Sequence, residues 1–158
     1  MAHHLAQVNI ARMIEPIGHP KNYEFFAALD AVNAEAEASP GFVWRMKDDS
    51  GNATNIQGFE WDSHDAAAVI VNLTVWESLE ALTDYIYGGG HVVVMKKRRK
   101  WFQPVDAATT ALWWIPAGTI PTVEEAEAKI RHLREHGESR EAFSLRFSFP
   151  PPSDRMGT

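Results

Sequence analysis

The sequence predicts an α+β domain with a ferredoxin-like, split βαβ sheet. Two observations carry this prediction. Four segments alternate in side-chain character with the two-residue period of a strand, and the segments between them place apolar residues three and four positions apart, as helices do. In chain order they read strand, helix, strand, strand, helix, strand, which is the element order of the split βαβ fold, and one further helix follows.

The first two elements are a strand and a helix. Alternation over residues 5–14 predicts a strand that carries Gln7 and Asn9 on one face. Apolar residues at helical spacing predict a helix over residues 23–38. A Ser-Pro-Gly sequence follows this segment directly, and this combination ends a helix.

Two strands come next. Residues 42–47 predict a strand with Phe42 and Trp44 on one face and Arg45 on the other. The third strand is expected over residues 69–76, where an alternating pattern leaves polar groups on one of two largely apolar faces.

The third strand leads into a helix and a glycine break. On one face of this strand lie Asn72 and Trp76, and Ser78 is the expected N-cap of the helix that follows. The three glycines at 88–90 end that helix. His91 then opens a second helix at a place from which its ring is able to point back towards the strand ends.

The last part of the chain predicts a strand, a helix and a further strand. Residues 109–115 form the fourth strand of the sheet, which contains Trp113. Thr122 and a glutamate three residues later have the spacing of a capping box, which predicts a helix over residues 122–136. Residues 142–149 alternate again and are expected to form a strand.

In the split βαβ arrangement the first and third strands lie side by side, and we expect them to run parallel. Asn9 and Asn72 would then be neighbours, on the face that the main helices leave bare. A second copy of the chain is the simplest cover for that face. The expected assembly is therefore a homodimer whose two sheets face each other in a dimeric α/β barrel, with an extra C-terminal helix.

The composition fits one folded domain that stays in the cytoplasm. The 158 residues are 45% hydrophobic and 23% charged, and we expect one domain over 1–149 and a disordered tail over 150–158. The sequence has no apolar run long enough for a membrane span and no pattern of a secretory signal at its start. It has no cysteine, which excludes disulfides and thiolate chemistry, and its net charge of -6 argues against nucleic-acid binding.

Several of these segments resemble a known superfamily. The sequence L-T-V-W-E-S-L-E-A-L-T-D-Y at 73–85, followed by His91, resembles the antibiotic-biosynthesis-monooxygenase-like superfamily of dimeric α/β barrels. The longer form of this chain, with A-S-P-G-F-V-W-R, L-W-W-I-P-A-G and P-T-V-E-E-A, resembles an uncharacterised bacterial branch known as a domain of unknown function. The resemblance implies the same fold as the periodicity does, and it implies a small-molecule site.

Two kinds of relative within this superfamily imply different chemistry. The polyketide-oxidising members oxidise phenolic substrates with molecular oxygen and need no metal or organic cofactor. The haem-degrading members use an asparagine on the first strand, a tryptophan on the second main helix and a histidine after it as the axial iron ligand. Asn9 and His91 have corresponding places in this chain, but Tyr85 stands at the tryptophan position and lies closer to the histidine.

The candidate catalytic residues are His91, Asn9, Asn72 and Tyr85. An imidazole titrates near neutral pH, so His91 suits a general base, whereas the alternative is a helix-start histidine with no chemical role. Asn9 and Asn72 are able to donate hydrogen bonds to developing negative charge, or they only satisfy each other within the sheet. Tyr85 would orient a substrate at the mouth of the site.

The candidate substrate-binding residues are four aromatic side chains and one cation. The six tryptophans of the chain either line a flat hydrophobic pocket or pack in the core and at an interface. The cation needs a carboxylate partner, either from the chain or from a ligand. These five residues are Trp44, Arg45, Trp76, Tyr87 and Trp113.

Metal binding is not predicted. His132 and His136 are four residues apart on a helix but have no third ligand in the sequence pattern, so we expect them at the surface. The basic run at 96–100 spreads around a helix, which predicts a solvated face, with attraction of an anionic substrate as the alternative.

These observations favour a small monooxygenase-like enzyme that acts on an aromatic or polyketide-like molecule without a cofactor. In this hypothesis His91 is the base, and Asn9, Asn72 and Tyr85 place the substrate. The alternatives are a haem-binding or haem-degrading-like protein and a dimer that binds a small hydrophobic molecule without turnover.

Overall fold

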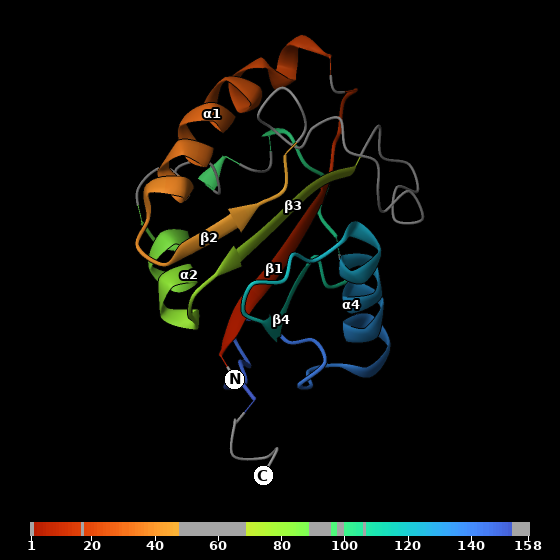
Figure 1. The fold of residues 1–158 in the computed structure, drawn as a ribbon. Helices are drawn as coiled ribbons and strands as arrows, with labels where there is room; N and C mark the ends of the chain where they lie inside the picture. Colours follow the sequence, from red (N-terminus) through yellow and green to blue (C-terminus); the bar gives the residue numbers. More distant parts are fainter. Residues whose placement is uncertain are drawn as a thin grey trace.

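The computed structural model describes residues 2–16, 18–47, 69–88, 96–97, 100–105 and 107–152. Four strands form one sheet in the order β2-β3-β1-β4 (Figure 1). Their bounds are β1 His3–Arg12, β2 Phe42–Arg45, β3 Val69–Trp76 and β4 Thr110–Pro116. The predicted α+β, ferredoxin-like class and the added C-terminal helix are therefore confirmed.

The two central strands are neighbours, as predicted, but they run antiparallel rather than parallel. The helix α1 (Tyr23–Ala38) carries the chain back so that β2 runs in the same direction as β1. The strand β3 pairs antiparallel with β2 and lies between β2 and β1, so it opposes both. The predicted parallel direction of the first and third strands was therefore wrong, since every neighbouring pair of strands in this sheet is antiparallel.

The helix ends follow local sequence signals. The helix α2 (Leu79–Ile86) begins after Ser78, whose Oγ accepts a hydrogen bond from the N–H of Ala81 at 3.1 Å. In α4 (Val123–His136), the Oγ1 of Thr122 accepts from the N–H of Glu125 at 3.0 Å. Both predicted N-caps are confirmed. None of the helices in the described part of the chain combines the length and the apolar character that a bilayer span requires.

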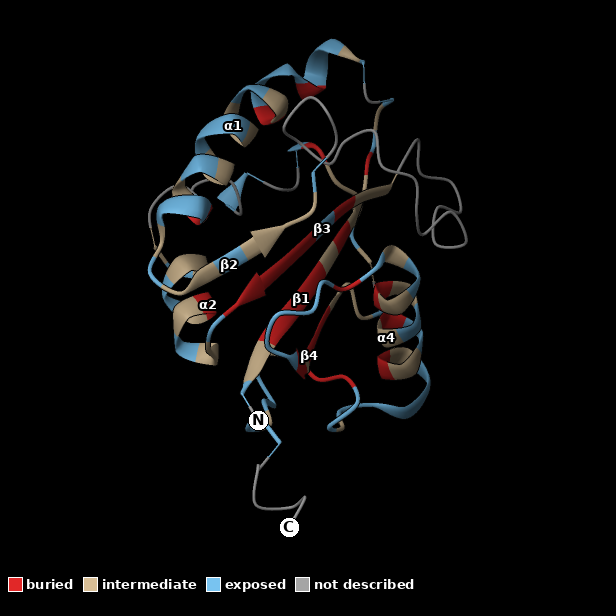
Figure 2. Ribbon diagram, viewed as in Figure 1, coloured by how far each residue is buried: buried red, intermediate tan, exposed pale blue. Residues whose placement is uncertain are grey.

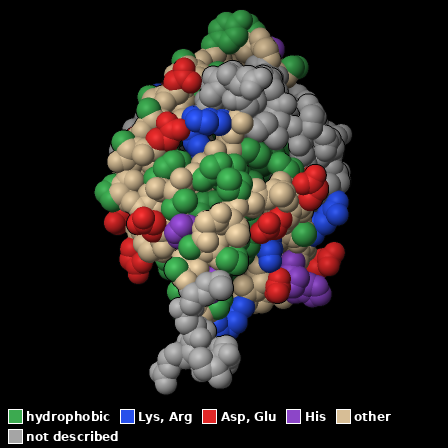
Figure 3. All heavy atoms as spheres, in the orientation of Figure 1, with side chains coloured by type: hydrophobic (Ala, Val, Ile, Leu, Met, Phe, Trp, Pro, Cys, Tyr) green, Lys and Arg blue, Asp and Glu red, His purple; other side chains and the backbone are tan. Residues whose placement is uncertain are grey.

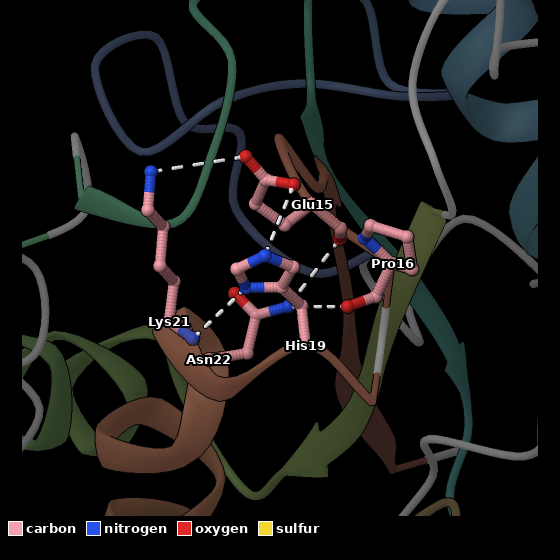
Figure 4. Close-up of polar contacts among 5 residues, drawn as sticks. All are labelled: Glu15, Pro16, His19, Lys21 and Asn22. Atoms are coloured by element: carbon pink, nitrogen blue, oxygen red, sulfur yellow. Dashed lines mark hydrogen bonds and ion pairs between the residues drawn. The ribbon is translucent and has the colours of Figure 1, made fainter.

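A polar turn fixes the start of α1 (Figure 4). The buried side chain of Asn22 donates through Nδ2 to the carbonyl oxygens of Pro16 at 2.8 Å and Glu15 at 3.3 Å. The Nδ1 of His19 accepts from the N–H of Lys21 at 3.1 Å, and the carboxylate of Glu15 lies 3.7 Å from His19 Nε2. The turn therefore closes on itself and sets the direction in which α1 leaves the sheet.

Each face of the sheet is covered by helices of the same chain. On one side β1, β3 and β4 present a largely apolar surface that packs against Ala126, Ile130 and Leu133 of α4. Figure 2 shows the buried residues that line these strands and the facing side of α4. On the other side α1 and α2 contribute Ala36 and Leu82 to a second core cluster.

This arrangement corrects the predicted faces of the sheet. Asn9 and Asn72 lie on the side of α1 and α2, whereas we expected them on a bare side. The opposite side, which α1 and α2 do leave uncovered, carries residues such as Val8 and Leu73, which are 0% and 1% exposed because α4 covers them. A bare sheet face therefore no longer argues for a second copy, and the homodimer stays a prediction.

A β-bulge in β2 changes which side its aromatic residues face. Phe42 pairs with Trp76, but Trp44 pairs with Val75, so the register shifts between them. Phe42 consequently packs on the side of α1 and α2, and Trp44 on the side of α4. The prediction that Phe42 and Trp44 share a face was wrong, because strict alternation does not hold across the extra residue of a bulge.

The predicted strand at 142–149 is reduced to a single bridge. Phe143 exchanges two backbone hydrogen bonds with Leu112 of β4, at 2.7 and 3.0 Å. A turn then bonds the N–H of Phe147 to the carbonyl of Ser144, which interrupts the alternation. The segment instead contacts the free edge of β4 at this bridge. A second contact comes from the Nε1 of Trp114, which donates to the Phe149 carbonyl at 2.9 Å.

The end of β1 is extended by a segment from the region of the predicted second helix. Phe102 forms a bridge with Met13, and the N–H of Ile14 bonds the carbonyl of Trp101 at 2.9 Å. Trp101 is buried and packs on the ring of Phe25 from α1. This contact joins the sheet to the beginning of α1.

Candidate functional site

A cavity of about 260 Å³ lies between the sheet and the helices α1 and α2. An apolar cavity of about 150 Å³ already accepts a benzene ring, so this space suits a molecule of one or two rings. Its apolar walls come from both helices and from the two segments that border the sheet. They include Leu29, Val32, Leu82, Ile86, Phe102 and Leu145.

The floor of the cavity is polar and is built from paired positions of neighbouring strands. Asn9 lies directly opposite Asn72 on β3 and opposite Thr110 on β4. Two residues before Asn9 on β1, Gln7 lies directly opposite Thr74. Because residues two apart on a strand face the same way, these five side chains form two adjacent polar rows.

A chain of hydrogen bonds runs through the row of Gln7. The indole Nε1 of Trp76 donates to the Oγ1 of Thr74 at 2.9 Å. The Thr74 hydroxyl in turn donates to the Oε1 of Gln7 at 2.8 Å. Gln7 and Thr74 are only 7% and 4% exposed, so the chain connects polar groups that are buried.

The row of Asn9 is more open. The Nδ2 of Asn9 donates to the Oγ1 of Thr110 at 2.7 Å, which fixes the amide across β1 and β4. Asn72 is exposed although it lies on the floor of the cavity, and among the described residues no side-chain hydrogen bond holds its amide. This end of the floor is therefore accessible to a ligand. The prediction that Asn9 and Asn72 are neighbours is confirmed.

Arg45 borders the cavity beside Thr74, its partner across β2 and β3. Its Nε lies 3.1 Å from the Oε2 of Glu37 at the end of α1, and its side chain is 10% exposed. Lys47 lies 3.9 Å from the same carboxylate oxygen. The carboxylate that a buried arginine requires thus comes from the chain itself.

Tyr85 stacks on Trp76, with ring centroids 5.1 Å apart, and its hydroxyl donates to the carbonyl of Val32 at 3.4 Å. Burial raises the pKa of Tyr85 to about 12, and the negative charge of Glu35 adds to this while Arg45 opposes it. The phenol therefore stays protonated at neutral pH and is not a general base.

The structure separates the predicted site residues into groups. Asn9, Asn72, Tyr85 and Arg45 line the cavity, and Trp76 lies behind Tyr85, fully buried. His91 lies outside the described residues.

The other predicted residues do not reach this cavity. Trp44 and Trp113 pack on the opposite side of the sheet, where the Nε1 of Trp113 donates to the Glu125 carboxylate at 2.6 Å. Tyr87 follows α2 and is 69% exposed. The predicted grouping of these three residues with the asparagines is therefore not seen, because two belong to the α4 core and one to the surface.

Sequence reasoning missed three polar residues of the floor, namely Gln7, Thr74 and Thr110. Gln7 and Thr74 share the alternation that singled out Asn9 and Asn72, so the strand pattern held a signal for both. Thr110 became visible only through its cross-strand position beside Asn9.

Part of the basic run at 96–100 is paired with an acidic residue of α1. Lys97 lies 2.7 Å and Lys100 lies 3.6 Å from the carboxylate of Glu24 on α1, so two lysines of the basic run pair with an acid. The hydrogen bond from Lys97 and the charge of Lys100 lower the pKa of Glu24. Figure 3 shows acidic side chains on both flanks of one face and basic ones in small groups.

The two histidines of α4 were expected at the surface. His132 and His136 lie on α4 with ring centroids 4.6 Å apart, and His136 is exposed. Across the described ranges, no three His, Asp or Glu side chains come close enough together to hold a metal ion.

The fold and the cavity define a class of protein: an α+β domain in which one antiparallel sheet and two helices enclose a space for a small molecule. The chain belongs to the family described as Domain of unknown function (DUF3291), which it matches over residues 4–157. Among curated proteins, no match to this chain is found.

Solved structures show a similar course of the chain. SnoaB, a cofactor-independent oxygenase from Streptomyces nogalater, is 16% identical, with 75% of this chain and 97% of that chain covered and a TM-score of 0.44. NE2512 from Nitrosomonas europaea, a protein of unknown function, is 10% identical, with 76% and 96% covered and a TM-score of 0.47. PA3566 from Pseudomonas aeruginosa is 12% identical, with 75% and 98% covered and a TM-score of 0.46.

Proposed function

We propose that this protein oxidises a small aromatic or polyketide-like molecule with molecular oxygen, without a metal or organic cofactor. The observation that carries the proposal is the cavity itself, in which apolar walls stand over a floor of amide and hydroxyl groups. Apolar walls favour a flat ring, and a few polar groups at fixed positions orient it. In such a reaction the substrate itself supplies the electrons that reduce oxygen.

The amides of the floor supply electrostatic stabilisation in this proposal. Removing a proton from a phenol places negative charge on its oxygen and ring. Hydrogen-bond donors that are already oriented towards that charge lower the barrier, because they need no rearrangement during the reaction. Asn72 in one row of the floor and Gln7 in the other carry such donors, and the hydrogen bond from Asn9 to Thr110 anchors the row of Asn72.

The proton acceptor in the proposal is His91. Within the described part of the cavity wall, the titratable side chains are Arg45 and Tyr85. An arginine stays charged at neutral pH, and Tyr85, with a pKa of about 12, stays protonated, so neither accepts a proton from the substrate. A neutral histidine after α2 would supply the missing base.

The same observation favours a second candidate function, the binding of a small aromatic molecule without turnover. The described wall residues bind and orient a ligand but supply no base. If His91 does not face the cavity, binding is the function that these residues support.

Haem, the other alternative, does not fit the described residues. The cavity of about 260 Å³ is small for a macrocycle, and among its described wall residues there is no histidine. No step of the proposed reaction therefore uses haem.

Oxygen consumption with 1-naphthol as substrate tests the proposal. We expect the purified protein to consume oxygen faster than buffer alone, and His91→Ala to remove the excess rate while a Tyr87→Phe control keeps it. If the protein binds 1-naphthol in calorimetry but consumes no oxygen, binding without turnover is supported. A Soret band in protein from haem-fed cells that is lost in His91→Ala would overturn the cofactor-free proposal.

A further inference from the structure

We infer that the floor of the cavity selects a ring compound that carries a carbonyl oxygen at one end and a hydroxyl group at the other. The inference rests on the proposed function and names its ligand class. It assigns the carbonyl to Gln7, whose amide is held through its oxygen, and the hydroxyl to Asn9, whose amide is held through its nitrogen.

The chain of hydrogen bonds from Trp76 determines what Gln7 offers. An indole N–H only donates, so the Oγ1 of Thr74 acts as its acceptor and the Thr74 hydrogen is left to donate to the Oε1 of Gln7. The hydrogen bond from Thr74 thus holds the Gln7 amide through its oxygen. Its Nε2 has no acceptor among the described residues, and Gln7 lines the cavity, so Gln7 offers a hydrogen-bond donor.

Asn9 offers the opposite group. Its Nδ2 donates to the Oγ1 of Thr110 at 2.7 Å, so the donor side of the amide is directed towards β4. The Oδ1 has no donor among the described residues, and Asn9 lines the same cavity. A ligand therefore meets a hydrogen-bond acceptor at Asn9.

The distance between the two residues sets the size of the ligand. Residues 7 and 9 lie on the same face of β1, so their backbones are about 7 Å apart along the strand. A single ring with substituents at opposite ends spans this interval. The walls above it, Leu29, Val32 and Leu82, are apolar and suit the faces of the ring.

Arg45 strengthens the end at which the carbonyl would lie. It is the cross-strand partner of Thr74 and borders the cavity beside Gln7's row. Its positive charge, shared with Glu37, favours an oxygen that gains negative charge over a neutral or cationic group. The polar floor therefore has a direction, from the acceptor at Asn9 to the donor at Gln7, which lies beside the positive charge of Arg45.

Four probes of similar shape test this direction in calorimetric titrations at neutral pH. They are para-hydroxyacetophenone, acetophenone, para-ethylphenol and ethylbenzene, which differ only in the carbonyl and the hydroxyl. We expect para-hydroxyacetophenone to bind about tenfold more tightly than para-ethylphenol. Gln7→Met should abolish this carbonyl preference and leave the affinity for para-ethylphenol nearly unchanged.

Thr74→Val tests the positioning role of the threonine. This variant keeps the shape of the side chain but cannot hold the Gln7 amide, so the carbonyl preference should fall by about fivefold. A purely structural role would weaken all four probes alike. Thr119→Val, at an exposed hydroxyl, is the matched control and should change none of the affinities.

The outcomes separate the inference from the proposed function. Probes that bind with equal affinity, or a Gln7→Met variant that weakens all four equally, overturn the inference while the cavity remains a binding site. Failure of all four probes to bind overturns both. A carbonyl preference that disappears in Gln7→Met supports the inference whether or not oxygen is consumed.

Discussion

Tyr85 lies flat on Trp76, with their ring planes 27° apart and their centroids 5.1 Å apart. Trp76 ends β3 and Tyr85 lies in α2, so the stack fastens the helix to the sheet beside the cavity. The tryptophan also holds Thr74 through its Nε1. One aromatic pair thus connects the roof of the cavity to its floor.

The first prediction concerns alkaline pH. The pKa of Tyr85 is raised from its ordinary value of 10.0 to about 12, chiefly by burial. The neutral phenol is therefore favoured in the folded state, and the stability it contributes is complete below pH 10 and is lost as pH rises towards 12. In an absorbance titration, Tyr85→Phe should remove an ionisation step near pH 12, and Tyr87→Phe should leave that step in place. A wild-type titration without a step in this range would contradict the prediction.

The second prediction concerns Gly41, where the chain turns from α1 into β2. Its φ is +83°, and a Cβ at this position would lie 2.5 Å from the Cβ of Ala81 in α2. Gly118 has a similar φ of +91° but open space around it. Both alanine variants bear the left-handed backbone penalty, so Gly41→Ala should lower the free energy of unfolding by about 1–3 kcal/mol more than Gly118→Ala. Urea denaturation of the two variants measures this difference, and equal losses would show that α2 yields to the new methyl group.

The third prediction concerns the buried hydroxyl of Thr74. Thr74→Val leaves the Nε1 of Trp76 and the Oε1 of Gln7 without their shared partner, and an unsatisfied buried polar group is destabilising. We expect the free energy of unfolding to fall by about 1–3 kcal/mol. Thr119→Val removes an exposed hydroxyl that bonds the Pro116 carbonyl and should change stability by less than about 0.5 kcal/mol. Similar losses in the two variants would argue against the buried chain.

The fourth prediction concerns access to the cavity. Leu29 of α1 lines the cavity, so Leu29→Trp should fill the space and weaken the binding of para-ethylphenol by at least about tenfold, or 1.4 kcal/mol. Ala27 lies on the exposed side of the same helix, and Ala27→Trp should leave binding unchanged. Calorimetric titration of both variants checks the result. Equal affinities would place the bound ring elsewhere on the protein.

Local signals were sufficient for the four strands of the sheet and for the helix ends described above, although not for residues 142–149, which form only a bridge. The helix predicted over residues 23–38 has these bounds in the structure, and the caps at Ser78 and Thr122 make the expected hydrogen bonds. These features depend on contacts between residues that are only a few positions apart in the sequence. Asn9 and Asn72 were also predicted as neighbours, because the order of the strands places β1 beside β3, although the direction of β3 was predicted wrongly.

The parts that the sequence did not reveal depend on contacts between distant residues. The bulge after Phe42 turns Trp44 to the side of the sheet that α4 covers. The sequence of this four-residue strand contains no signal that predicts the bulge. The face that α4 covers depends on the path of the chain after β4. The role of Gln7 depends on Thr74, 67 positions away, so its hydrogen-bonding state appears only in the folded chain.

The polar rows on β1 and β3 also bear on how the chain reaches its fold. A slip of one residue between these strands would turn Gln7 and Asn9 towards the apolar surface of α4 and bring Val8 towards the cavity. Buried amides without partners would make that misaligned sheet unstable relative to the correct one. The side chains that form the polar floor of the cavity therefore also favour the correct register of the two central strands during folding.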